Sequence, residues 1–275
     1  MNKKPQPKTL TVLSNTTVTP NMQRITLGGN DISLFPADSA GQYVKLMFTA
    51  KGETNLSLLA EGEKAVLRTF TVGSFDQQNQ SITLDLVRHD SDNQAPLNPD
   101  AGGYAARWAQ TAAEGDTITI GGPKPIQSYL EQGEWFLMIG DMTSLTALKA
   151  KLSALPKQAK GYVVVNVTTT DDMQILPMPE GMKLVVNSVA DSDISLAQNV
   201  KALEWLEGDV SVWCACEFSM MRELRSYVNS DKGVARKNCY FSSYWKEGVT
   251  EDGHKVIKRQ DAESLKAKAS TGSKS

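Results

Sequence analysis

The chain is poor in the residues that build metal centres and disulfide frameworks. Its 275 residues include only three cysteines, Cys214, Cys216 and Cys239, and two histidines, His89 and His254. An odd number of cysteines argues against a framework of paired disulfides. So few thiol and imidazole ligands form neither a structural zinc site nor a histidine-based iron site, and we therefore predict no metal-binding residues.

Long apolar runs and an excess of one charge are also absent. No stretch approaches the roughly 20 apolar residues that cross a bilayer, and the N-terminal residues MNKKPQPKT lead into no apolar signal core. A net charge of -2 gives no support to nucleic-acid binding. With 40% hydrophobic and 22% charged residues, the composition is that of an ordinary globular protein. We therefore expect a cytoplasmic protein without membrane or nucleic-acid partners.

The first domain, residues 1–125, has the pattern of an antiparallel β-barrel. Short β-rich segments are separated by Gly, Asn, Asp and Pro at the spacing that is typical of barrels and sandwiches. A polar segment at 90–103 is too long for a tight turn and predicts a surface loop, and 104–110 predicts a short helix. The expected strands are 9–18, 22–27, 42–48, 65–72, 81–87 and 117–120.

The second domain, residues 126–250, alternates strands with helices. Leucines recur at positions 145, 148, 152 and 155, on one face of a helix that ends at Pro156. Apolar strands that alternate with helices predict an α/β domain with a parallel sheet covered on both faces. The expected strands are 135–140, 162–167, 183–189, 210–216 and 239–244, and the further helices are 194–206 and 219–229, with Ser219 as N-cap of the latter.

Two features limit what the second half can be. The dinucleotide fingerprint G-x-G-x-x-G is missing, so the α/β domain is not a standard tight NAD site. The third segment, residues 251–275, is a basic tail with only a weak helical pattern at 256–268. We expect this tail to be solvated or frayed, with helix as the alternative.

The segment Arg68-Thr69-Phe70-Thr71 at an expected strand carries the strongest chemical signal. The planar guanidinium of Arg68 suits a diphosphate, the ring of Phe70 suits another flat ring, and the hydroxyl of Thr71 can bond a ring nitrogen. Together these groups match the parts of a flavin dinucleotide. The alternative is an ordinary half-buried strand surface, and these four residues alone do not decide between the two.

Two carboxylates follow expected parallel strands, at the edge where ligands of α/β sheets bind. Asp141 comes directly after the strand 135–140, with Thr143 or Ser144 as a candidate cap of the next helix. Glu217 follows Cys216 at the end of the strand 210–216. Glu217 is either a solvated loop carboxylate or a polar group that faces a ligand, and the sequence leaves both open.

Several segments in this order resemble the siderophore-interacting protein family, which belongs to the ferredoxin-reductase-like superfamily. The resemblance covers nearly the whole chain up to about residue 255. It rests on Arg68-Thr69-Phe70-Thr71, Asp85-Leu86-Val87-Arg88-His89, Gly103-Tyr104-Ala105-Ala106-Arg107-Trp108-Ala109, Gly121-Gly122-Pro123, Gly140-Asp141 with 143–147, Trp213-Cys214-Ala215-Cys216-Glu217 with Met221-Arg222, and Tyr244-Trp245-Lys246-Glu247-Gly248.

The resemblance implies a monomeric, cytoplasmic FAD protein that reduces ferric siderophores and releases Fe(II), with electrons from NAD(P)H or a ferredoxin. No catalytic side chain is expected, because the flavin itself transfers the electrons. By position, Arg68 would bind the FAD diphosphate, Phe70 would flank the flavin ring and Thr71 would approach its N5. The remaining expected FAD contacts are Thr69, Asp85, Val87, His89, Ala105, Ala106, Trp108, Asp141 and Thr143.

A ferric chelate with anionic oxygens should dock on basic side chains beside the flavin. The resemblance points to Lys45, Lys124 and Lys246, which we expect to converge, and to Lys255 and Lys258 as further candidates. The electron donor is expected near Cys216 and Glu217. Two alternatives stay open: another flavin or ferredoxin-type reductase of the same superfamily, and a siderophore-binding protein without enzymatic activity.

Overall fold

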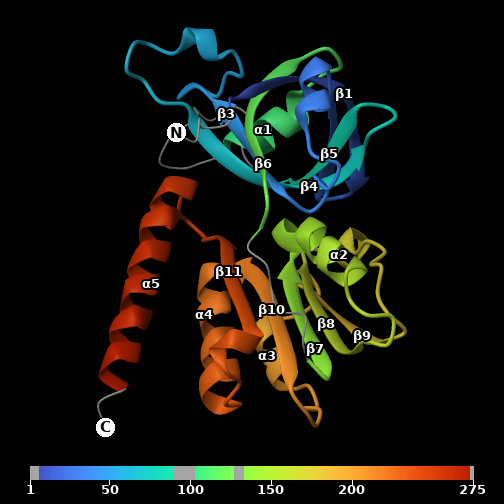
Figure 1. Ribbon diagram of the computed structural model, residues 1–275, viewed down its shortest axis with the longest axis vertical. Helices are drawn as coiled ribbons and strands as arrows, with labels where there is room; N and C mark the ends of the chain where they lie inside the picture. The colour runs from blue at the N-terminus through green and yellow to red at the C-terminus, as the bar shows by residue number, and fades with distance from the viewer. Residues whose placement is uncertain (1–5, 89–102, 127–132, 273–275) are drawn as a thin grey trace.

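The protein is described by a computed structural model that covers residues 6–88, 103–126 and 133–272, without the side chains of 266–272. Two domains follow one another along the chain, and a long helix at the C-terminal end lies beside the second (Figure 1). His89 and most of the expected loop 90–103 lie outside the described residues. None of the helices within the described ranges is long and apolar enough to span a bilayer.

The first domain is a closed barrel with the strand order β1-β2-β5-β4-β3-β6, and its paired strands are antiparallel. Apolar side chains alternate along each strand, so one face of every strand fills the barrel core. The short helix α1 (Tyr104–Thr111) adds Tyr104 and Trp108 to that core. The strands are β1 (Lys8–Thr19), β2 (Met22–Gly28), β3 (Tyr43–Phe48), β4 (Val66–Asp76), β5 (Ser81–Val87) and β6 (Thr117–Lys124).

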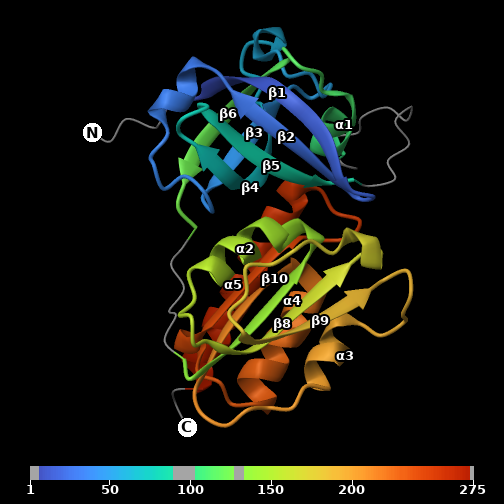
Figure 2. The same ribbon diagram turned by 90° about the vertical axis from the view of Figure 1, so that its right-hand side faces the viewer.

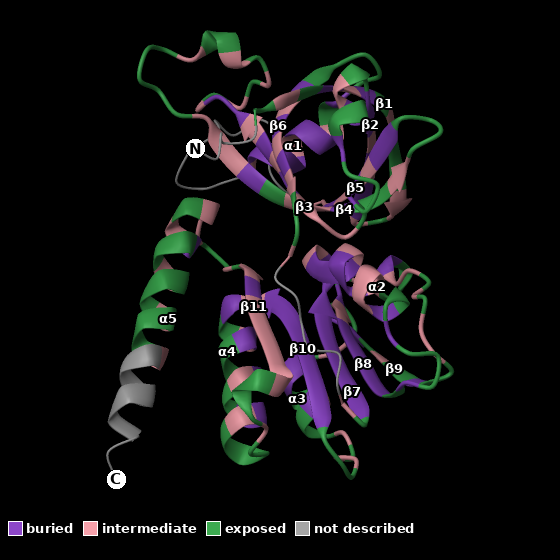
Figure 3. Cartoon of the chain, viewed as in Figure 1, coloured by how far each residue is buried: buried purple, intermediate pink, exposed green. Residues whose placement is uncertain are grey.

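The second domain is a parallel sheet with the order β11-β10-β7-β8-β9. Its central strands are buried on both faces (Figure 3), since helix α2 covers one face and helices α3 and α4 cover the other. The elements are β7 (Trp135–Asp141), α2 (Leu145–Ser153), β8 (Lys160–Val167), β9 (Gly181–Ser188), α3 (Leu196–Lys201), β10 (Val210–Glu217), α4 (Phe218–Ser226) and β11 (Cys239–Trp245). The predicted barrel followed by an α/β domain is therefore confirmed.

Two predicted helix boundaries are wrong. The helix expected over 194–206 is only α3, which begins after a capping box of Ser195 and Gln198. The apolar residues beyond it pack without helical structure, and Trp205 meets Trp135 edge-on at 5.0 Å between ring centroids. Helix α4 is capped by Glu217 rather than Ser219, because the carboxylate of Glu217 accepts the backbone N–H of Ser219 and of Met220.

The C-terminal segment is a helix, α5 (Glu251–Gly272), rather than a frayed tail. Its first turns bury His254 and pack Ile257 against the α/β core. Further along, Asp261 accepts two hydrogen bonds of 2.8 Å from the guanidinium of Arg225 on α4. Its apolar periodicity is weak because a few buried residues and the ion pairs of Asp261 with Arg225 and Arg222 anchor it, and the sequence pattern therefore does not reveal this helix.

The two domains share part of their cores. The turn between β1 and β2 extends from the barrel toward the sheet of the second domain (Figure 2), and Met22 is buried among the side chains of that domain. Val18 and Val87 pack against the same cluster. The barrel is thus fixed to the α/β domain by apolar burial as well as by the chain connection.

The backbones of β7 and β8 approach closely at Gly161, and a substitution there tests this contact. Gly161 in β8 has φ +134°, and an added Cβ would lie 2.0 Å from the carbonyl oxygen of Phe136. We expect Gly161→Ala to lower the free energy of unfolding by roughly 3 kcal/mol or more, because backbone must move. Urea denaturation measures this loss.

The matched control is Gly233→Ala. Gly233 also has a positive φ, +69°, but no atom lies within 4 Å of an added Cβ. This control carries only the conformational cost of about 1 kcal/mol. Equal losses in the two variants would contradict the close contact.

Candidate functional site

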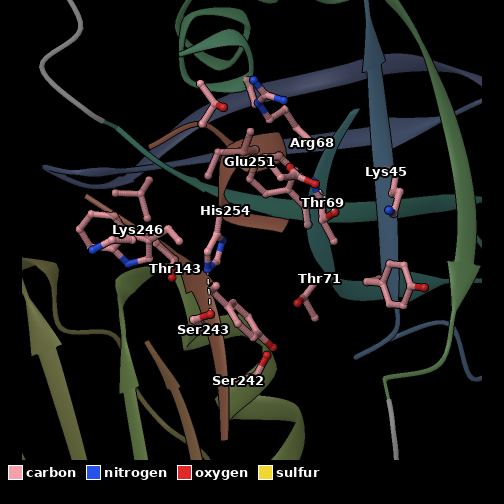
Figure 4. A pocket seen from close by; sticks show the side chains of 18 of the residues that line it. Lys45, Arg68, Thr69, Thr71, Thr143, Ser242, Ser243, Lys246, Glu251 and His254 are labelled. Atoms are coloured by element: carbon pink, nitrogen blue, oxygen red, sulfur yellow. Dashed lines mark hydrogen bonds between the residues drawn. The ribbon is translucent and has the colours of Figure 1, made fainter. Parts of the chain in front are cut away.

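The main cavity lies where two barrel strands separate. β4 and β5 are paired from Asp76↔Ser81 to Val72↔Leu84, and the pairing stops there. Beyond this point Arg68–Thr71 of β4 and Asp85–Val87 of β5 both line a cavity of about 610 Å³. β11 and the first turns of α5 form the opposite wall (Figure 4). This volume is in the usual range for small-molecule and cofactor sites.

One end of the cavity is suited to a diphosphate. Gly103 to Ala106 line it, and within the described residues no side chain caps the N-terminus of α1. The guanidinium carbon of Arg68 lies 4.9 Å from the centre of the Tyr104 ring, so the ring fixes the position of this charge. A helix N-terminus and a guanidinium are the two groups that proteins most often present to phosphate oxygens.

The middle of the cavity presents the exposed edge of β4. The N–H and the hydroxyl of Thr69 donate to the carboxylate of Glu251 at 3.1 and 3.0 Å. Because strand N–H groups alternate in direction, the N–H of Thr71 faces the same side. The hydroxyl of Thr71 is within hydrogen-bonding reach of Tyr244, while burial raises the pKa of the Tyr244 phenol. Phe70 packs partly on the barrel core and lines the cavity.

A buried serine–histidine pair forms part of the opposite wall. Ser243 Oγ and His254 Nε2 are 2.8 Å apart, and both side chains line the cavity. Burial, followed by the nearby charge of Lys258, lowers the pKa of His254 to about 4. The imidazole is therefore neutral near pH 7.

Four of the five expected lysines line the cavity, namely Lys45, Lys246, Lys255 and Lys258. Lys124 is exposed at the end of β6 and is not part of the lining. Lys45 lies on the β3 side and Lys246 on the β11 side (Figure 4), so the expected convergence of Lys45, Lys124 and Lys246 on one point is not seen.

Most of these lysines already interact with the protein. Lys246 lies 3.8 Å from Glu217 and donates to Ser219, and Lys255 pairs with Asp252 at 2.8 Å. Lys258 donates to the carbonyl oxygen of Ser243, and burial lowers its pKa. Among the ion pairs of the described ranges, Lys45 takes part in none.

Three expected site residues make structural contacts and are absent from the cavity lining. Asp141 is buried and accepts hydrogen bonds from Thr143 N–H, Thr143 Oγ1 and Trp245 Nε1, so it does not line the cavity. Trp108 packs edge-on against Phe48 inside the barrel. Glu217 caps α4. Strand-end carboxylates in this chain thus order the turns that follow them.

Cys216 does not reach the cavity either. It is buried beside Cys214 with 3.8 Å between the sulfur atoms, and this contact together with burial raises its pKa well above the ordinary value. The remaining expected FAD contacts that line the cavity are Arg68, Thr69, Phe70, Thr71, Asp85, Val87, Ala105, Ala106 and Thr143.

On the wall formed by β11 and α5, sequence reasoning predicted only the lysines and missed the other lining residues. Tyr240, Ser242, Ser243, Glu251 and His254 all line the cavity. One signal was available, since β11 is the last apolar strand and its carboxyl end must face the same edge as those of its parallel neighbours. The contact of Glu251 with Thr69 spans 182 positions, which no local pattern reveals.

The barrel and the sheet domain each match a domain of one family. Residues 11–126 match the siderophore-interacting FAD-binding domain, and residues 133–248 match the siderophore-interacting protein domain. The chain belongs to the siderophore-interacting protein family. The predicted family membership is confirmed.

Relatives of known name are similar over most of their length. The ferric vibriobactin reductase ViuB of Vibrio cholerae is 29% identical over 90% of this chain and 92% of its own. The ferric acinetobactin reductase of Acinetobacter baumannii is 26% identical over 67% of this chain and 62% of its own. The siderophore-interacting protein SipS from Aeromonas hydrophila superposes with a TM-score of 0.76 at 26% identity, covering 92% of this chain and 99% of that one. Ferredoxin-NADP+ reductase from Plasmodium falciparum (TM-score 0.61, 11% identity, 87% and 97% covered) shares the fold.

The residues present fit FAD, the cofactor of the matched barrel domain. The first turn of α1, which receives no side-chain cap from a described residue at Gly103, and the guanidinium of Arg68 offer donors for a diphosphate, and the edge of β4 that has no strand partner offers the N–H of Thr71. The flat side chain of Phe70 lines the same space. These donors and this ring match the diphosphate and ring system of the cofactor.

The buried imidazole of His254 predicts a pH dependence of stability. Its pKa is about 4 in the folded protein and about 6.5 in an unfolded chain. Between these values only the unfolded state binds the proton, so stability falls as the pH drops from about 6.5 to about 4, by at most about 1.4 kcal/mol per pH unit. We expect His254→Gln to remove this part of the slope in urea denaturation.

The control for this measurement is a variant that changes a charge near His254 but not the charges that surround its imidazole. Lys258, Lys246 and Glu217 surround the imidazole. Lys255→Gln removes a nearby charge on the exposed side of α5 while leaving the imidazole in place, so this variant should keep the slope. The same slope in wild type and in His254→Gln would refute the assignment.

Proposed function

We propose that the protein is an FAD-dependent reductase of ferric siderophores, which acts in the cytosol and releases Fe(II) for iron assimilation. One observation carries this proposal. A single cavity between the domains contains both groups suited to a diphosphate, around Arg68, and a set of lysines, Lys45, Lys246, Lys255 and Lys258. The names of the relatives ViuB and ferric acinetobactin reductase support the same activity.

The chain's own residues would hold FAD in a defined way. Arg68 and the N–H groups of α1 would bind the diphosphate, and the Tyr104 ring would keep the Arg68 guanidinium in place. Phe70 would flank the ring system, and Thr71 would hydrogen-bond it. When bound, FAD would supply the redox chemistry, because a flavin can exchange electrons in pairs or singly.

The lysines would hold an anionic ferric chelate near the cofactor. Their charge compensates the hard anionic oxygens of the chelate, so the protein need not coordinate the iron itself. Reduction to Fe(II) weakens a cage of hard oxygen ligands and lets the metal leave. NAD(P)H or a ferredoxin would supply the electrons from the side of the α/β domain. The donor would bind near Cys216 and Glu217.

One titration tests the proposal as a whole. The visible spectrum of the purified protein is followed anaerobically while NADH, NADPH or reduced ferredoxin is added, and then an anionic ferric tris-catecholate. We expect a yellow protein whose colour bleaches with one donor and returns with the chelate. Faster oxidation by free flavin than by the chelate would favour another flavin reductase, and a colourless protein that binds the chelate would favour a non-enzymatic binding protein.

Arg68 should determine how tightly FAD binds. Losing a charge-assisted hydrogen bond of about 1.5–3 kcal/mol predicts roughly 10- to 100-fold weaker binding in Arg68→Ala. Arg68→Lys should fall between this variant and wild type, because it keeps the charge but loses the planar fork. Fluorescence titration of the FAD-free protein gives the Kd, and unchanged affinity in Arg68→Ala would overturn this role.

Lys45 should contribute more to chelate binding than Lys124, although both lie at the same end of the barrel. Lys45 lines the cavity and Lys124 does not. We expect Lys45→Ala to raise the KM for the anionic chelate roughly 2- to 10-fold at low salt and less at high salt, because salt screens the charge. Lys124→Ala should change neither KM nor FAD content. Equal effects of the two variants would argue against this docking face.

A further inference from the structure

A buried carboxylate of the second domain holds a turn of the first. Asp172, in the short helical turn Thr170–Asp172 after β8, is fully buried. One carboxylate oxygen accepts the Thr19 hydroxyl and the Asn21 N–H, each at 2.8 Å. The other oxygen accepts Asn21 Nδ2 at 2.8 Å, and Thr169 N–H and Oγ1 at 3.0 and 2.9 Å. Thr19 and Asn21 belong to the barrel, so three of the five hydrogen bonds cross between domains.

The turn that Asp172 holds is directly connected to the cavity wall. The carbonyl oxygen of Asn21 accepts the N–H of Arg88 at 2.9 Å. The next pair in the ladder is Met22 opposite Val87, and Val87 lines the cavity. A short chain of hydrogen bonds thus runs from Asp172 through Asn21 to the end of β5.

The same turn carries the apolar contact between the domains. Met22 is buried in the core of the α/β domain, with Val18 and Val87 packed beside it. Apolar contacts alone are not directional. The hydrogen bonds of Asp172 add direction, because five donors of fixed geometry converge on two oxygens.

An ionised carboxylate is the side chain that this arrangement requires. Burial would raise the pKa of Asp172, but hydrogen bonds from Asn21, Thr19 and Thr169 outweigh it and the pKa is lowered. Both oxygens are therefore acceptors near pH 7. An asparagine would offer one acceptor oxygen and turn an amide N–H toward groups that themselves donate.

We propose that Asp172 is a positioning residue for the cofactor cavity: it locks the β1–β2 turn to the α/β domain and thereby fixes the end of β5 that forms one cavity wall. This inference rests on the proposed function, because it assigns the residue's role to FAD binding and chelate reduction. Asp172 does not line the cavity, and it acts only through Asn21 and the strand end beyond it.

The test compares Asp172→Asn with Asp171→Asn. Asp171 is the exposed neighbour in the same turn, so this control makes the same change of charge and size. We expect Asp172→Asn to weaken FAD binding about tenfold, in line with a buried donor left without its acceptor. The backbone N–H of Arg88, which donates to the carbonyl oxygen of Asn21, should exchange with solvent at least about tenfold faster in the FAD-free variant. Asp171→Asn should match wild type in both measurements.

A paired exchange gives a rescue experiment. Asn21→Asp combined with Asp172→Asn restores an amide–carboxylate hydrogen bond across the domains with the donor reversed. We expect the double variant to recover part of the FAD affinity lost in Asp172→Asn. No recovery, with Asp172→Asn alone still weak, would show that the loss comes from disturbance inside the second domain and would overturn the proposal.

These readouts separate this proposal from the proposed function. A lower Tm in Asp172→Asn with unchanged FAD affinity, or with unchanged exchange at Arg88, would mean a purely structural role and would overturn the inference. Neither readout requires a ferric chelate. If the wild-type protein bound FAD but failed to reduce the chelate, the proposed function would be wrong. The FAD affinities of the Asp172 and Asp171 variants would still decide the role of Asp172.

Discussion

The separation of β4 from β5 is the constraint on which the site depends. Strand N–H and C=O groups need partners, and β4 keeps those of β3 along Val66–Thr71 while it loses those of β5 beyond Val72. The barrel therefore stays continuous on one side of β4 and exposes a free backbone edge on the other. This edge, Arg68 and the start of α1 supply the polar donors of the cavity. Among the described residues, no separate loop is needed to supply them.

The opposite wall depends on α5 being held at its first residue and again near its middle. Glu251 binds the free edge of β4 through Thr69, and ten residues later Asp261 binds Arg225 on α4. Between them, His254 is buried against Ser243. A helix with so little apolar surface would be marginal in isolation, so its order comes from these contacts with β4, β11 and α4. The barrel and the C-terminal helix thus stabilise the same cavity.

Strong local patterns predicted the fold and half of the site. Apolar alternation identified the strands, and the grouping of Arg68 with Phe70 and Thr71 on one strand indicated a cofactor. The carboxylates Asp141 and Glu217 do not line the cavity, and the physical reason is local: at the end of a parallel strand the next helix needs a cap, and a carboxylate can supply it. Contacts such as Glu251 with Thr69 depend on how two domains meet, and a single sequence contains no signal for that.

The charge of the cavity depends on pairing more than on the number of lysines. Lys246 and Lys255 are compensated by Glu217 and Asp252, and Lys258 donates to the carbonyl oxygen of Ser243 and has a pKa lowered by desolvation. An anion that approached these three would compete with contacts already formed, and its gain would be small. Lys45 offers a charge without such competition in the described structure. The side of the cavity formed by β3 is therefore where an anionic ligand gains most, although the net charge of the whole chain is negative.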